Sequence, residues 1–73
     1  MKEYTTRTGA VQYKPELRVD IQVEDFEGNR GWCLACGELV EEVEPDARRH
    51  ECECCGEKKV YGLEELALLG LIE

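Results

Sequence analysis

Two short segments, Cys33-Leu34-Ala35-Cys36-Gly37 and Cys52-Glu53-Cys54-Cys55-Gly56, decide the fold of this chain. We call them the first knuckle (residues 33–37) and the second knuckle (residues 52–56). In each, two cysteines three positions apart are followed directly by glycine, whose missing Cβ permits a tight turn that aims both sulfurs at one point. Two such turns complete a tetrahedron of thiolates, and this spacing predicts a metal site. The predicted ligands are Cys33, Cys36, Cys52 and Cys55.

Zinc is the metal expected from this spacing. Because protein sulfur fills all four positions, no position stays open for water or substrate, and we expect one structural zinc rather than a catalytic one. Four thiolates also accept iron, so the residue types alone leave an iron site as the less favoured alternative.

Two other residues, one within the second knuckle and one just before it, have side chains that can bind a metal. Cys54 lies between the two predicted ligands of the knuckle, where side chains usually point outward, and we interpret it as an unused thiol. An exchangeable ligand and a redox-sensitive thiol stay open as alternatives for it. His50, the only histidine, stands two positions before Cys52, which fits neither ligand position, so we interpret it as a surface residue.

The size of the chain explains why it needs a metal. It has 73 residues, enough for one domain. A core of this size rarely supplies more than about 3–5 kcal/mol, so small domains add disulfides, a metal or a partner subunit. Five cysteines, an odd number, in a chain that starts without an apolar secretory segment argue against a disulfide framework. We therefore expect a cytoplasmic metal protein, and no stretch reaches the roughly 20 apolar residues that cross a membrane.

Before the first knuckle, the clearest pattern lies at residues 17–23, where apolar and charged or polar residues alternate and predict a half-buried strand. Residues 11–13 are candidates for a shorter strand on the same sheet, and residues 25–31 contain the glycine and asparagine of a turn. Residues 1–10 are polar and threonine-rich without a hydrophobic period, and we expect a flexible N-terminal arm there.

The segment between the knuckles has the length of one β-hairpin. Residues 38–44 would leave the first knuckle, Pro45 would lie in a type I turn, and residues 48–53 would return as a strand. Residues 58–62 then predict a short strand, and residues 63–72 predict a helix with two glutamates in its first turn.

These residues carry a resemblance to a known family. Residues 32–62 resemble a zinc ribbon, a two-knuckle β-hairpin domain, and both C-x2-C-G knuckles match its pattern. The string 44–48, together with Val60-Tyr61-Gly62 and Glu64-Glu65-Leu66, is similar to short, mostly uncharacterised zinc-ribbon proteins of bacterial viruses and prophages. The resemblance implies a fold, no established activity, and a host protein as target if the chain is viral, which would place it in the host cytoplasm.

A second resemblance favours the iron alternative. The first knuckle followed by Cys54-Cys55-Gly56-Glu57 is also similar to rubredoxin and desulforedoxin, small acidic electron carriers with one iron in four thiolates. Desulforedoxin-like proteins place about fifteen residues before the vicinal cysteine pair, whereas here that gap ends at Cys52.

We therefore predict an α+β fold, a small metal-stapled zinc ribbon in which an antiparallel β-hairpin carries the knuckles. An extra N-terminal strand and a C-terminal helix complete it. The predicted single domain covers residues 11–73, with the knuckles at 33–56 and the helix at 63–72.

The net charge of the chain disfavours some classes of binding partner. There are 17 acidic and 9 basic residues, giving a formal net charge of −8, which disfavours duplex nucleic acid and anionic membrane surfaces. The alternative, a transcription-associated or nucleic-acid-contacting ribbon, depends on two basic pairs. They are Arg48 with Arg49 and Lys58 with Lys59.

A protein partner, one with basic character, fits the acidic balance better. The predicted helix has more apolar residues than one small core covers, and the candidate partner contacts are Leu68, Leu69 and Ile72. The same residues could instead cover the predicted strand or form a homodimer. A Ser-His-acid hydrolase is excluded because the chain contains no serine. We expect a protein-interaction module or small regulator, not an enzyme.

Overall fold

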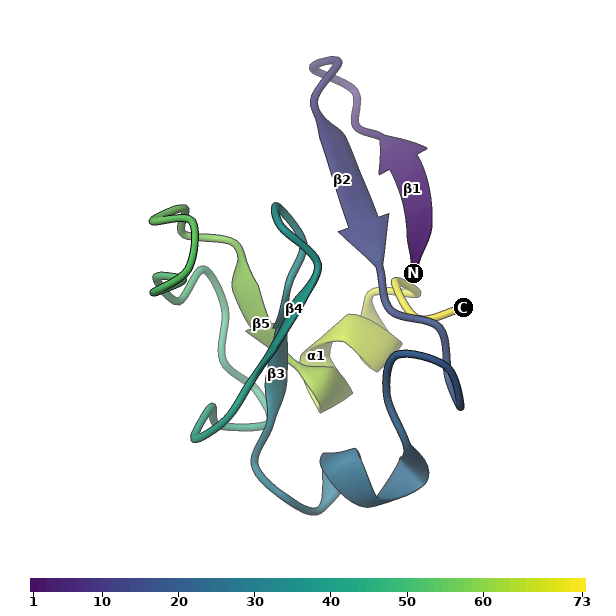
Figure 1. Cartoon of the computed structure of the whole chain (residues 1–73), viewed down its shortest axis with the longest axis vertical. Coiled ribbons are helices and arrows are strands. Elements are labelled where there is room, and N and C mark those ends of the chain that lie inside the picture. The colour runs from purple at the N-terminus through teal and green to yellow at the C-terminus, as the bar shows by residue number, and fades with distance from the viewer.

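The computed structural model describes all 73 residues, which form two small antiparallel sheets, one 3-10 helix and one α-helix (Figure 1). The first sheet pairs β1 (Lys2–Thr5) with β2 (Val11–Lys14). The second has the order β4-β3-β5, from β3 (Gly31–Cys33), β4 (Glu38–Val40) and β5 (Val60–Gly62). The helices are η1 (Val23–Phe26) and α1 (Leu63–Leu68).

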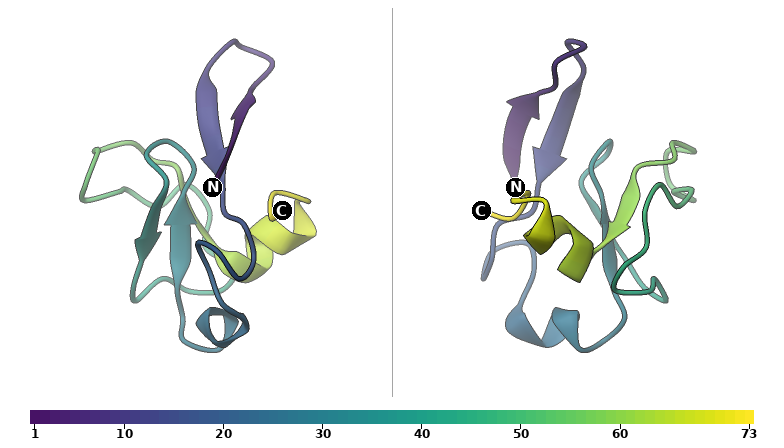
Figure 2. Two further views of the ribbon diagram at one scale, coloured as in Figure 1. Left: turned by 45° about the vertical axis from the view of Figure 1, so that its right-hand side comes forward. Right: turned by 180° about the vertical axis from the view of Figure 1, so that it is seen from behind.

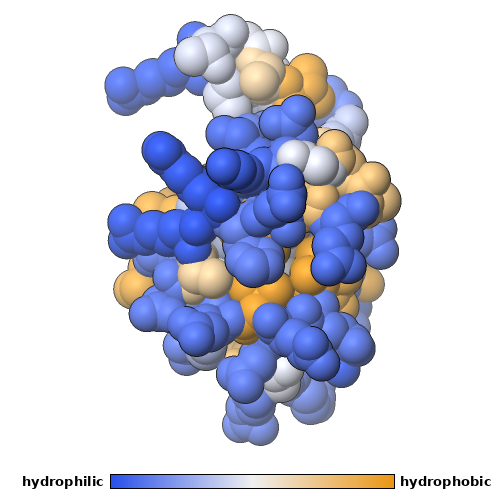
Figure 3. Space-filling model, turned by 90° about the vertical axis from the view of Figure 1, so that its left-hand side faces the viewer, coloured by the Kyte–Doolittle hydropathy of each residue, from blue (hydrophilic) through white to orange (hydrophobic).

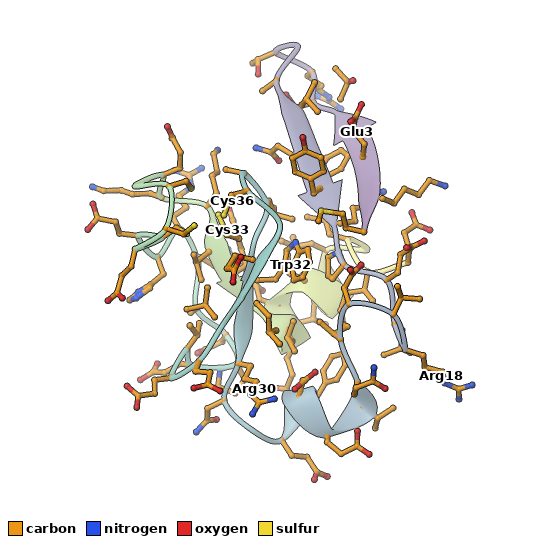
Figure 4. All side chains as sticks on the ribbon, viewed as in Figure 1. Glu3, Arg18, Arg30, Trp32, Cys33 and Cys36 are labelled. Carbon is orange, nitrogen blue, oxygen red and sulfur yellow. The ribbon has the colours of Figure 1, made fainter.

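Strand β3 is the centre of the molecule, buried at all three residues. Successive side chains of a strand point to opposite faces, so Trp32 and Cys33 face opposite ways. Trp32 belongs to a cluster that we call the apolar core, completed by Ile21, Leu34, Leu63 and Leu66. Cys33 belongs to a second cluster, the cysteine core, with Val43, Cys52 and Val60. Figure 4 shows Trp32 and Cys33 on this strand. The sheet therefore separates two small cores.

Helix α1 is shorter than the predicted 63–72 because a Schellman motif ends it. Gly70 has φ +72°, its N–H donates to the Ala67 carbonyl at 3.1 Å, and the Leu71 N–H donates to the Leu66 carbonyl at 2.8 Å. Both hydrogen bonds are those of the motif, which reverses the chain. Leu71 and Ile72 then pack against the apolar core from outside the helix.

Gly62, just before α1, makes a close approach between two segments possible. A Cβ there would overlap the carbonyl oxygens of Glu44 and Pro45, while the Gly62 N–H donates to the Ala47 carbonyl at 3.0 Å. The loop between the knuckles therefore lies directly on the start of α1. Arg48 from this loop donates to Glu65 of α1 at 2.7 Å and 3.1 Å.

The predicted strand at residues 17–23 is wrong. The chain turns there instead, since Arg18 has φ +69° and three successive N–H groups, from Val19 to Ile21, donate to the Glu16 carbonyl. The Asp20 carboxylate accepts the Glu16 N–H at 2.9 Å, a side-chain contact that competes with sheet pairing. Of the alternating apolar residues only Ile21 is fully buried, while Val19 stays 70% exposed.

Within residues 1–10, where a flexible N-terminal arm was predicted, residues 2–5 form strand β1. The hairpin β1–β2 stands away from the rest of the chain (Figures 1 and 2). Its base is bonded to β3 and the first knuckle: the Tyr13 N–H donates to the Leu34 carbonyl at 2.8 Å, and the Trp32 indole N–H donates to the Tyr13 carbonyl at 3.0 Å.

The predicted hairpin between the knuckles does not form. Residues 38–40 pair with β3, and of residues 48–53 only His50 pairs, through a bridge to Val60 in β5. Each knuckle therefore closes its own hairpin. The first joins β3 to β4, and the second joins His50 to Val60.

Candidate metal centre

The four predicted ligand sulfurs lie within 4.8 Å of one another, one pair from each knuckle. Two distances cross between the knuckles, 3.7 Å from Cys33 Sγ to Cys55 Sγ and 3.7 Å from Cys36 Sγ to Cys52 Sγ. These separations are far longer than a disulfide bond of about 2.05 Å, and all five cysteines are free. The cluster is one that can hold a metal ion.

Two of the four sulfur–sulfur distances between the knuckles match the edge of a tetrahedral thiolate site. With metal–sulfur bonds of about 2.3 Å, the edge of a regular tetrahedron is about 3.8 Å. Both distances agree with that edge to within about 0.1 Å. The arrangement is consistent with a zinc-ribbon-like site.

The two knuckles have the same backbone geometry. Gly37 and Gly56 have φ of +74° and +77°, and each donates its N–H at 2.8 Å to the carbonyl of the first cysteine in its knuckle. This left-handed conformation is nearly free for glycine and costly for other residues. The glycine after each cysteine pair is therefore what closes the turn.

Backbone N–H groups also point at the first sulfur of each knuckle. The amides of Cys55 and Cys54 lower the pKa of the Cys52 thiol to about 7. Burial raises the pKa of Cys33, although the amides of Cys36 and Ala35 oppose it. Burial also raises the pKa of Cys36. Amide donors are the groups that stabilise a thiolate, so the knuckles supply the hydrogen bonds that a metal-bound sulfur needs.

Exposure differs among the four sulfurs. Cys33 and Cys52 are buried, Cys36 is half-buried and Cys55 is exposed, so one corner of the cluster reaches the surface. In Figure 4, Cys33 and Cys36 lie at the end of the sheet near the second knuckle. Cys54 is exposed and lies outside the cluster. His50 is also exposed and joins β5 only through its backbone.

The three predicted partner contacts differ in exposure. Leu68 is 84% exposed and Leu69 is 48% exposed, whereas Ile72 packs against the apolar core. The four basic residues predicted as nucleic-acid contacts also differ in exposure and in ion pairing. Arg48 forms the ion pair with Glu65, while Arg49 and Lys58 are exposed and Lys59 is half-buried.

Sequence reasoning did not find a groove of about 590 Å³ beside the cysteine core. Five glutamates line it, and their spacing gave no signal because the two walls come from separate segments, residues 38–42 and 50–54. The lining residues are Glu38, Leu39, Val40, Glu41, Glu42, His50, Glu51, Cys52, Glu53 and Cys54.

No family model, no curated protein and no solved structure matches the chain. None of its helices has the length and apolar character that spanning a membrane requires.

Proposed function

We propose that this chain is a non-catalytic zinc-binding protein that acts as a protein-interaction module. One structural zinc would be held by Cys33, Cys36, Cys52 and Cys55, in a fold of the zinc-ribbon type. The observation that carries the proposal is the cluster of four free sulfurs, whose cross-knuckle distances of 3.7 Å fit a tetrahedral ion. Four thiolates leave no ligand position for substrate, which supports a structural role.

Metal analysis tests the zinc assignment. The full chain would be purified from cells supplied with both zinc and iron, and its metal content and visible absorption would be measured. We expect one zinc per chain and a colourless protein. A coloured protein with one iron per chain would overturn the assignment and favour an electron carrier.

The exposure of Cys55 is the observation that favours this second candidate. A metal-bound sulfur at the surface would give an electron a short path to a partner. The knuckle amides that point at Cys33 and Cys52 would stabilise thiolates around either metal.

Charge and exposed leucines support a protein partner. The net charge is −8, and four thiolates with one divalent ion would add about −2. Leu68 and Leu69 give α1 an exposed apolar end, suited to another protein or a second copy of the chain. A host protein as target is a hypothesis that rests only on the resemblance of residues 44–48, 60–62 and 64–66 to phage zinc-ribbon proteins.

A nucleic-acid titration tests the class of partner. Zinc-loaded protein would be titrated against labelled duplex and single-stranded DNA near physiological salt, and we expect no appreciable binding. Arg48, the first residue of the predicted basic pairs, is already paired with Glu65. Micromolar affinity that falls steeply with salt would show phosphate contacts and favour the nucleic-acid-contacting ribbon.

A further inference from the structure

The groove beside the cysteine core lies between two segments of the chain. Its walls are residues 38–42, which contain all of β4, and residues 50–54. Residues 38–40 of the first wall are extended as β4, residues 41–42 form a bend, and residues 53–54 of the second wall lie in a turn. Strand β4 is at the end of the order β4-β3-β5 and has no partner on its outer side.

The backbone along both walls has free hydrogen-bonding groups. The N–H groups of Glu41 and Glu51, one from each wall, donate no hydrogen bond within the chain. The floor includes Val40 and Cys52, which belong to or pack against the cysteine core. An apolar floor beside the open edge of β4 is suited to an added extended segment.

The negative charge of the walls indicates the charge of the segment that could bind there. The five glutamates of the groove are all exposed, and only Glu41 has a cation within 4.0 Å, the Arg30 guanidinium at 3.6 Å. The other four have no ion-pair partner. Elsewhere, Asp25 and Glu65 are each paired with an arginine. The groove therefore gathers negative charge that the chain itself does not neutralise. Figure 3 shows that the side of the molecule bearing the knuckles is mostly hydrophilic, with hydrophobic areas between.

We propose that this groove binds an extended basic segment of a partner protein, which adds to β4 as a strand and places Lys or Arg side chains against the glutamates. The segment would have cationic residues alternating with apolar ones, because one set would face the walls and the other the floor. This inference deepens the proposed protein-interaction function and rests on it.

The test uses the zinc-loaded full chain and a fluorescently labelled peptide of sequence KVKVKV. We expect binding by fluorescence anisotropy that weakens with salt, and no binding of the peptide EVEVEV. The E38Q/E51Q variant, with one change in each wall, should weaken KVKVKV binding about fivefold, as two partly exposed ion pairs would give. The matched control E24Q/E27Q removes the same charge from η1 and its C-cap and should leave affinity unchanged. An equal loss of peptide affinity in both variants would overturn the assignment of binding to the groove.

A second peptide tests strand addition. N-methylation of alternate backbone nitrogens keeps the positive charge of KVKVKV but removes donors, and we expect affinity to fall at least about tenfold. Unchanged affinity would overturn addition to β4. Amide NMR shifts should change at residues 38–42 and 50–54, and shifts confined to Leu68 and Leu69 would also overturn the proposal. Zinc content is measured on the same samples. If the protein binds zinc but not the peptide, only this inference is overturned. If it binds no zinc, the proposed function is overturned.

Discussion

The two cores on opposite sides of β3 differ in what holds them together. The apolar core combines Trp32 with three leucines and Ile21, and α1 covers it. The cysteine core contains only small side chains, two cysteines and two valines at its centre. Burial of apolar surface stabilises a fold roughly in proportion to area, so the cysteine core has much less to gain from burial. Packing therefore stabilises the half around the apolar core, whereas the other half contains four sulfurs that could hold a metal ion.

The largest expected effect is removal of the metal. Structural zinc in small domains supplies on the order of 10 kcal/mol of folding free energy, and the valines of the cysteine core cannot replace it. We expect a strong chelator to unfold the knuckles, seen as loss of amide NMR dispersion at residues 33–37 and 52–56. Retained dispersion throughout after complete metal removal would show that packing alone holds both halves.

The next largest effect is expected in the apolar core. Leu66 is fully buried there, while Leu68, on the same helix, is 84% exposed. We expect Leu66→Ala to lower the free energy of unfolding by about 2–5 kcal/mol. Leu68→Ala should change it by less than about 0.5 kcal/mol. Urea denaturation of the two zinc-loaded variants measures this, and equal losses would show that Leu68 also contributes to the core.

A smaller effect is expected where the loop between the knuckles meets the helix. Gly62→Ala would place a methyl group against the Glu44 and Pro45 carbonyls and should cost about 3 kcal/mol, the upper end of the range for overpacking. Gly28→Ala is the matched control because a Cβ there has no neighbour closer than 3.7 Å. Thermal unfolding of both variants measures the difference, and equal stability would contradict the close approach.

The smallest effect concerns the ion pair that joins this loop to α1. Glu65 is 5% exposed at its side chain, and hydrogen bonds from Arg48 hold the pKa of its carboxyl below the ordinary value. Arg48→Gln would remove the positive charge beside this buried carboxylate, and we expect a lower melting temperature. Arg49→Gln, at an exposed neighbour without an ion pair, should leave the melting temperature unchanged. A shift of equal size in both variants would show that only net charge matters.

The parts of this molecule that local sequence determines could be predicted. The four cysteines predicted as ligands do lie together: each pair and its glycine form a local turn, and the pairing of β3 with β5 brings the two turns side by side. Strand β2 contains the predicted residues 11–13, and β5 lies within the predicted residues 58–62. Helix α1 begins at Leu63 as predicted.

The errors arise where contacts between distant residues or side-chain hydrogen bonds compete with periodicity. Residues 17–23 have the pattern of a strand, but the Asp20 side chain and the left-handed Arg18 make a turn there. Strand β1 has no apolar period and forms through pairing with β2. The signal that ends α1 was present in Gly70, which a C-cap interpretation of residues 69–71 would have found.

The most direct test of the metal centre compares two neighbouring cysteines by metal analysis. Cys54 and Cys55 are adjacent and both exposed, but only Cys55 belongs to the cluster of sulfurs. We predict that Cys54→Ser keeps one zinc per chain at wild-type affinity, whereas Cys55→Ser loses zinc or binds it far more weakly in competition with a chelator. Zinc loss in Cys54→Ser together with full retention in Cys55→Ser would contradict the account, because the four sulfurs that lie together would then not be the ligands.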